Sequence, residues 1–331
     1  MPFSQILGHH ALLDLLRRSV DRRRVPQSLL FAGPDGVGKR TTALAMAQAI
    51  NCPKQANGDA CGTCSSCTRI EKGQFSDVVL IEKGDEASLK IDVLRARLLD
   101  QVGYRPFEGT RRVFIIDPAD DLTEQAQDAL LKTLEEPPPS AIIVLISAYP
   151  DTLLATIRSR CRRLRFGALT EADVARVLIE RRGFEPVAAR ARAAASGGSV
   201  ARALDIEEDE FDDDRAAALG MLEAAARSTG PGERLKAGAA FAKHAAKRRA
   251  REAAATRLAI LASLLRDLGS ISSGGGVALA NADLDDQLRR LAGSYSVERV
   301  AGAFGAVEQA EVALGRNASP KIVADWLAVS V

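Results

Sequence analysis

Short apolar runs alternate with longer amphipathic segments over the first half of the chain. Four of the apolar runs have the length of buried strands: residues 27–32, 78–81, 112–117 and 141–147. Three segments between them have the mixed apolar and polar spacing that is typical of helices: residues 42–51, 91–102 and 123–136. Strands that alternate with helices predict an α/β fold with a parallel sheet covered on both faces.

The strand-like runs stop at about residue 169, and helical patterns follow. An acidic stretch at 205–214, with eight acids and no base, marks a join between two helical parts. We therefore expect three domains: an α/β domain at 1–167 with an insert at about 52–67, a small helical domain at 168–206 and an all-helical domain at 207–331.

Two further segments of the last domain stand out. Residues 270–276 predict a flexible loop, because serine and glycine dominate them. The basic run at 243–251 predicts a solvated helix face, and contact with DNA or an acidic partner is the alternative.

The composition is that of an ordinary globular protein. Of the 331 residues, 47% are apolar and 27% are charged, and 45 basic and 43 acidic side chains leave a net charge of +2. The longest apolar run is far shorter than the ~20 residues needed to cross a bilayer, and residues 1–10 do not resemble a secretion signal. We expect a cytoplasmic protein without membrane contact. The near-neutral charge disfavours a free-standing, sequence-specific DNA-binding protein.

A glycine-rich loop joins the first predicted strand to the helix that follows it. Gly33, Gly38 and Lys39 fit the spacing G-x-x-x-x-G-K, and Gly36 lies within it. Glycines allow successive backbone N–H groups to surround phosphate oxygens, and the lysine adds a positive charge. The loop therefore predicts a site for ATP or ADP, and a chance glycine-rich turn is the alternative.

Two departures weaken the site as a hydrolytic centre. Arg40 stands where the pattern has a Ser or Thr that binds Mg²⁺, and Thr41 follows one position late, about 100° further around the helix. Asp117, at the end of the third strand, holds Mg²⁺ in such sites or else caps a turn, but Pro118 follows it where a Glu often activates water. We expect a degenerate site, which includes Thr41 and Asp117, with poor Mg²⁺ binding and little or no ATP hydrolysis. Nucleotide binding without hydrolysis is compatible with both departures.

Four of the five cysteines are clustered. Cys52, Cys61, Cys64 and Cys67 fall within sixteen positions, and Cys161 stands alone. In a reducing cytoplasm, four thiolates with this spacing predict a structural Zn²⁺ site with no open coordination position. The alternative is a set of reduced thiols without metal.

Arginine is dense just after the fourth predicted strand. Five of the eight residues from Arg158 to Arg165 are arginine. Taken alone, such a run predicts a solvated or phosphate-facing surface.

Five sequence features together resemble the clamp-loader branch of the AAA+ family: FSQILGHHALLDLL at 3–16, GPDGVGK at 33–39, the four-cysteine insert, DALLKTLEEPP at 128–138 and IRSRC at 157–161. The resemblance covers about the first 205 residues. It implies an AAA+ fold in which a P-loop parallel sheet with helices on both faces precedes a small helical lid domain and an all-α collar. It also implies a function in DNA replication, within the clamp loader of DNA polymerase III.

The resemblance points to two paralogous subunits, the gamma/tau ATPase motor and the delta-prime stator, which share the cysteine insert and the IRSRC motif. The departures favour the stator. Arg40 and Pro118 replace a Thr and a Glu of the motor pattern, Arg202 is displaced by one position from the second nucleotide sensor, and no long tail follows residues 317–327. The ATP-hydrolysing motor is the alternative.

The resemblance also implies site residues and partners. Arg160 would be an arginine finger that reaches the ATP site of a neighbouring motor subunit, and Ser147 lies near the family's first sensor position. The implied partners are gamma/tau and delta subunits in a hetero-oligomer, with the sliding clamp and primed DNA contacted through the complex.

Overall fold

The computed structural model describes the whole chain except residues 85, 87, 206–207, 228–229, 244–249 and 317. The described residues form two compact units, Met1–Leu169 and Thr170–Val331. The predicted division of the second unit near residue 206 stays a prediction, because 206–207 lie outside the described residues. Residues 244–249 of the basic run and residue 317, where the last predicted helical segment begins, lie outside them as well.

The first unit is built on a parallel sheet of five strands in the order β2-β3-β4-β1-β5. The strands are β1 (Ser28–Ala32), β2 (Val78–Ile81), β3 (Arg112–Ile116), β4 (Ala141–Ser147) and β5 (Arg162–Arg165). The predicted α/β fold with a parallel sheet is confirmed. The sequence did not predict β5, because only Leu164 of this edge strand is buried and its three arginines are exposed.

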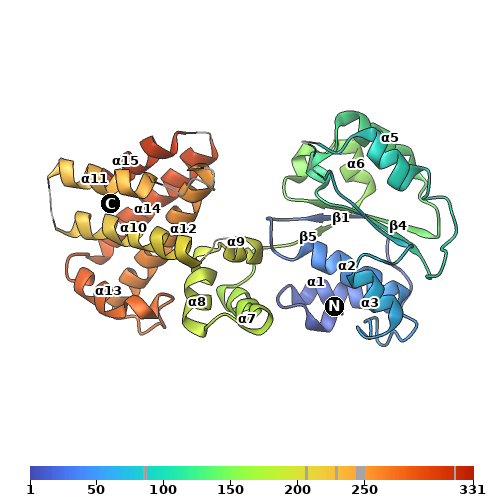
Figure 1. Cartoon of the computed structure of the whole chain (residues 1–331), viewed down its shortest axis with the longest axis horizontal. Helices are drawn as coiled ribbons and strands as arrows, with labels where there is room; N and C mark the ends of the chain where they lie inside the picture. Colours follow the sequence, from blue (N-terminus) through green and yellow to red (C-terminus); the bar gives the residue numbers. More distant parts are fainter. Residues whose placement is uncertain (85, 87, 206–207, 228–229, 244–249, 317) are drawn as a thin grey trace. The chain divides into compact units, whose positions relative to one another are not determined.

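Helices cover both faces of this sheet (Figure 1). One face packs against α1 (His10–Asp21), α2 (Lys39–Asn51) and α3 (Ser65–Glu71), and the other against α4 (Ile91–Leu94), α5 (Glu124–Glu135) and α6 (Ala155–Arg160). Side chains alternate between the faces along each strand, so Phe31 and Val113 enter one core, and Leu30 and Phe114 enter the other. Each face of the sheet therefore has an apolar core of its own.

Short turns complete the first unit. They are η1 (Phe3–Gln5), η2 (Arg95–Leu99, a π-helical turn that continues α4), η3 (Ala119–Asp121) and η4 (Pro150–Thr152).

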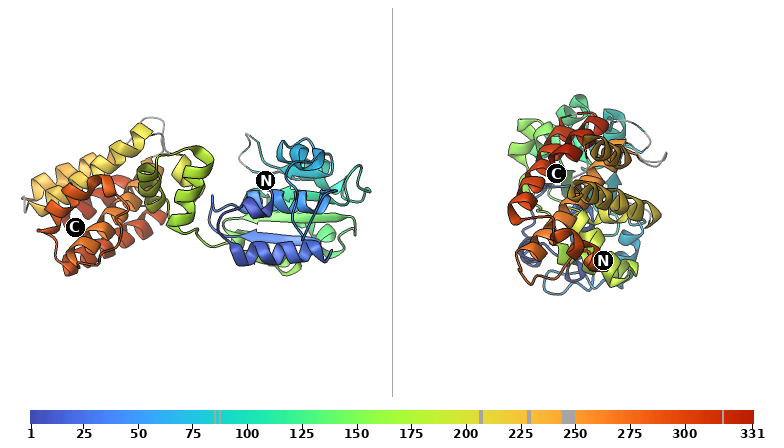
Figure 2. Two further views of the ribbon diagram at one scale, coloured as in Figure 1. Left: turned by 90° about the horizontal axis from the view of Figure 1, so that it is seen from below. Right: turned by 90° about the vertical axis from the view of Figure 1, so that its left-hand side faces the viewer.

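The second unit is helical, and Figure 2 shows it from yellow-green to red. Its elements are α7 (Glu171–Arg182), α8 (Pro186–Ala195), α9 (Val200–Leu204), α10 (Glu208–Ala226), α11 (Pro231–Ala242), α12 (Ala250–Ser272), η5 (Ala282–Leu284), α13 (Asp285–Ala292), α14 (Val297–Gly315) and α15 (Pro320–Ser330). Helix α12 is the centre of the core, and it packs against α8, α10, α13 and α14. Because α12 ends at Ser272, the predicted loop at 270–276 begins later than expected.

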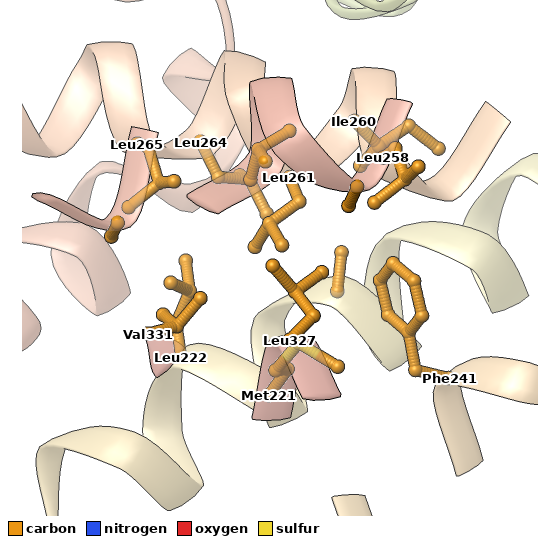
Figure 3. Packing of buried hydrophobic residues seen from close by; sticks show 14 of the residues in the cluster. Met221, Leu222, Phe241, Leu258, Ile260, Leu261, Leu264, Leu265, Leu327 and Val331 are labelled. Atoms are coloured by element: carbon orange, nitrogen blue, oxygen red, sulfur yellow. The ribbon is translucent and has the colours of Figure 1, made fainter. Parts of the chain in front are cut away.

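Figure 3 shows the close packing around α12. Leu258, Leu261 and Leu265 of this helix are fully buried and lie opposite Leu327 of α15 and Phe241 of α11. No helix in the described part of the chain is long and apolar enough to cross a membrane.

Candidate nucleotide site, arginine motif and metal centre

The glycine loop connects the carboxyl end of β1 to the first turn of α2. Gly33, Gly36 and Gly38 all have positive φ angles, of 156°, 74° and 97°. A Cβ on Gly33 would lie 2.1 Å from the backbone oxygen of Phe166, so this position has room only for glycine. Since β1 and β3 are parallel members of one sheet, the loop and Asp117 lie at the same edge.

Lys39 is folded back onto this loop. Its side chain is 5% exposed, and Nζ donates hydrogen bonds of 2.6 Å to the carbonyl oxygens of Gly33 and Pro34. The carboxylate of Asp35 lies 3.6 Å from Nζ. Burial lowers the pKa of Lys39, although the acids around it oppose this shift.

Arg40 joins the loop helix to the ends of two neighbouring strands. Its Nη2 donates to the Oε1 of Glu82 at 2.7 Å, and its Nε donates to the Oδ2 of Asp117. Burial raises the pKa of Asp117, and Arg40 offsets part of that rise. Thr41, one position further along α2, is half-buried. Glu82 was not predicted from the sequence as a site residue, although it directly follows the apolar run of β2, at the strand end where site residues of a parallel sheet lie.

Asp120 fastens the loop after β3 to the end of β4. Its carboxylate accepts from Ser147 Oγ at 2.5 Å and from the Ala148 N–H at 2.7 Å. The backbone oxygen of Ser147 in turn accepts from the Gly33 N–H at 3.1 Å. Asp117 and Pro118 are joined by a cis peptide bond. Asp120 is thus engaged in structural hydrogen bonds and is not free to act as a general base.

Arg160 is the last residue of α6 and lies at the surface. Its Nη2 pairs with Oε1 of Glu135, at the end of α5, at 2.5 Å, and its Nη1 donates to the Thr156 backbone oxygen at 2.9 Å. A third of its side chain is exposed. These partners come from α5 and α6, and among the described residues no hydrogen bond or ion pair joins Arg160 to the glycine loop of its own chain.

Cys161 anchors the same segment from the inside. Its thiol lies in the apolar core under α5 and α6, and burial raises its pKa to about 12. Next to it on β5, Arg162, Arg163 and Arg165 are exposed. The arginine run is therefore a surface feature, held by an inert buried cysteine.

The four clustered cysteines bring their sulfur atoms together. All four Sγ atoms lie within 4.8 Å of one another, and those of Cys52 and Cys64 are 3.9 Å apart. Zn–S bonds of ~2.3 Å in a tetrahedron place sulfurs slightly under 4 Å apart, so this set fits a zinc ion. The cluster can hold a metal ion such as zinc.

Backbone N–H groups point at these sulfurs. The N–H of Cys61 donates to the Cys52 sulfur at 3.4 Å, and that of Cys64 donates to the Cys61 sulfur at 3.3 Å. Hydrogen bonds from the Thr63 and Cys64 backbone lower the pKa of Cys61 to about 6, whereas burial raises that of Cys67. Such N–H donors favour thiolates, the form that binds metal.

The cysteine insert is attached to the start of the chain. Asp59 accepts hydrogen bonds from the N–H groups of Phe3 at 2.8 Å and Ser4 at 2.9 Å. A Cβ on Gly58 would lie 2.0 Å from the Arg17 backbone oxygen, which shows how closely the insert approaches α1. The insert is therefore packed into the first unit.

Comparisons with known proteins give a consistent family likeness. Residues 8–170 match a family described as "DNA polymerase III, delta subunit". The chain is 34% identical over 213 residues to the DNA polymerase III subunit delta′ of Bacillus subtilis, covering 64% of this chain and 63% of that protein. It is 33% identical over 211 residues to the DNA polymerase III subunit tau of Escherichia coli, covering 62% of this chain and 32% of that protein. The chain thus spans about a third of the length of the tau relatives that it matches.

A solved structure is also similar. It is a DNA polymerase III gamma subunit-related protein of Thermotoga maritima, with a TM-score of 0.40 and 18% identity over 96% of this chain and 97% of that chain.

Proposed function

We propose that this chain, which belongs to the clamp-loader group of the AAA+ family, is a non-motor subunit of the delta′ type in a DNA polymerase III clamp loader. The observation that carries the proposal is the ion pair between Arg40 and Asp117. It replaces the hydroxyl and carboxylate pair through which an ATPase of this class holds Mg²⁺.

The groups around the pair also argue against hydrolysis. Pro118 offers no group to accept a proton from water, and Asp120 is engaged with Ser147 and the chain after it. An attacking water would therefore lack a base as well as the metal. The glycine loop keeps its shape, so it is a degenerate nucleotide site in this proposal.

We propose that Arg160 acts on a neighbouring subunit instead. Its guanidinium is at the surface, and Glu135 and Thr156 hold it at the end of a short helix. A planar guanidinium can bridge two phosphate oxygens, which a lysine ammonium cannot do in the same way. An arginine supplied in trans in this way accelerates phosphoryl transfer by ~10³ to 10⁵ in other enzymes.

In this proposal the chain works in the cytoplasm with gamma/tau-type motor subunits and a delta-type subunit. The complex loads the sliding clamp onto primed DNA during replication. The cysteine cluster holds a structural zinc, since its four sulfurs leave no position for a reactive water. The helical domain at 207–331 serves as the collar that assembles the subunits.

The second candidate is an ATP-hydrolysing gamma/tau-type motor. Identity alone does not separate the two, because relatives named tau and delta′ match at 33% and 34%. The geometry around Arg40 favours the non-motor subunit.

ATP turnover by the isolated chain tests this choice. The protein is purified free of motor subunits, and steady-state phosphate release is measured with Mg²⁺, with Lys39→Ala as the matched control. We expect the two proteins to give the same background rate. Turnover that needs magnesium and is lost in Lys39→Ala would assign the chain to the motors.

A further inference from the structure

We infer that the guanidinium of Arg40 takes the place of the divalent cation, so that the glycine loop binds nucleoside di- or triphosphates without metal. The inference rests on the proposed function, since a motor needs magnesium at this place. Arg40 would then select the metal-free form of the ligand.

The first support for metal-free binding is the position of the Arg40 guanidinium. Glu82 and Asp117 end neighbouring strands, β2 and β3, and their carboxylates converge on Arg40. Carboxylate oxygens at such strand ends are the ligands that Mg²⁺ prefers. Here both carboxylates bind the guanidinium of Arg40, which occupies the sequence position of the metal-binding Ser or Thr. The protein itself therefore supplies the cation at this site.

The second support is the number of hydrogen-bond donors that Arg40 has left for a phosphate. A guanidinium has five N–H groups, and the bonds to Glu82 and Asp117 use the Nε proton and one proton of Nη2. Nearly half of the Arg40 side chain is exposed. The remaining N–H groups of Arg40 can donate hydrogen bonds to phosphate oxygens, which are the atoms that a metal ion would otherwise bind.

Burial explains why a metal would not displace the arginine. The Asp117 side chain is only 13% exposed. A carboxylate this far removed from solvent needs a cation beside it, and Arg40 supplies that cation from within the chain. Magnesium also gives up its own water reluctantly. A covalently attached cation therefore has the advantage at this site.

The lysine of the loop remains available for phosphate. Nζ of Lys39 is bound to the carbonyl oxygens of Gly33 and Pro34, both in the same loop. A phosphate that enters the loop would compete with these two neutral acceptors, and a charged acceptor forms the stronger hydrogen bond. The carboxylate of Asp35, which is 76% exposed, lies further from Nζ, at 3.6 Å. Two fixed cations, Lys39 and Arg40, would then face the ligand.

The experiment measures the affinity of the full chain for a fluorescent ATP analogue by anisotropy, in EDTA and in excess Mg²⁺. Arg40→Thr restores the hydroxyl, and Arg163→Thr is the matched control, because it removes an exposed arginine on β5. For the wild type we expect binding in EDTA that is equal to or tighter than in Mg²⁺, and the same for Arg163→Thr. Arg40→Thr should bind at least tenfold tighter in Mg²⁺ than in EDTA.

A second measurement counts bound Mn²⁺ by electron paramagnetic resonance in the presence of ATP. We expect no Mn²⁺ at this site in the wild type, and about one per chain in Arg40→Thr that Asp117→Asn removes. Tighter wild-type binding in Mg²⁺, no binding in EDTA, or an Arg40→Thr protein without bound Mn²⁺ would overturn the inference. Nucleotide binding that requires Mg²⁺ but gives no turnover would overturn the inference while the proposed function stands, whereas magnesium-dependent turnover would overturn both.

Discussion

Asp59 links the cysteine insert to the first residues of the chain, and its replacement by alanine should lower the free energy of unfolding of the first unit. Asp59 is 7% exposed, and its carboxylate accepts from three backbone N–H groups, those of Phe3, Ser4 and Ala60, at 2.8 to 2.9 Å. Phe3 is itself 1% exposed and belongs to the core around α1 and α2. Asp59→Ala therefore leaves at least one buried N–H group without its acceptor.

The expected loss of stability follows from these contacts. A hydrogen bond to a charged group contributes about 1.5 to 3 kcal/mol, and an orphaned buried donor costs about 1 to 3 kcal/mol. Because the three bonds share one carboxylate, their effects do not add fully, and we expect a total of about 3 kcal/mol. For a unit of this size the melting temperature should fall by roughly 6 to 12 °C. Asp59→Asn, which keeps one acceptor oxygen, should lose clearly less.

The assay is urea unfolding followed by far-ultraviolet circular dichroism. Trp326 is the single tryptophan and belongs to α15 in the second unit, so its fluorescence provides an internal control. In Asp59→Ala, the circular-dichroism transition that reports unfolding of the first unit should move to a lower urea concentration. The transition in Trp326 fluorescence, which reports the second unit, should not move. A loss below about 1 kcal/mol would refute the reasoning, since an exposed, dispensable loop would give that result.

Three further predictions concern single side chains. Cys64→Ser should reduce the metal content from about one zinc per chain to below about 0.2 in elemental analysis, with the circular dichroism of the sheet retained. Gly33→Ala should destabilise the first unit by at least about 2 kcal/mol more than Gly73→Ala in the same urea assay, because both positions have positive φ but only Gly33 would also clash with a backbone oxygen. Cys161 should stay unmodified by iodoacetamide at pH 8 in the native protein and react after denaturation, as peptide mass spectrometry can show, because burial raises its pKa to about 12.

The strands with apolar runs were predictable from the sequence, and β5 was not. β1, β3 and β4 are buried on both faces of the sheet, so each reads as a continuous apolar segment. In β5 only Leu164 points into the core, and four residues with one buried position give no periodic signal. The strand exists because it pairs with β1, which is a tertiary contact.

The candidate site likewise has some features that the sequence predicts and others that it does not. The glycine loop and the cysteine spacing are local patterns, and the sequence was enough to single them out. The partners of the arginines were not visible, because Glu82 lies 42 positions from Arg40 and Glu135 lies 25 positions from Arg160. Asp59 was likewise hidden, since its hydrogen bonds reach 55 and 56 positions back along the chain. Only the fold brings these groups together.

The proposed trans function of Arg160 is tested most directly in a reconstituted loader. Wild-type motor and delta-type subunits are assembled with this chain as wild type, Arg160→Ala, Arg160→Lys or the control Arg163→Ala, and size exclusion confirms that each complex is intact. ATP turnover is then measured with clamp and primed DNA. A finger of this kind contributes ~10³ to 10⁵ at its own site, so Arg160→Ala should lower the total rate by nearly the whole share of the one site that it serves, Arg160→Lys should recover little, and Arg163→Ala should match the wild type. An unchanged rate in an intact Arg160→Ala complex would contradict the account and leave the arginine run as a solvated surface.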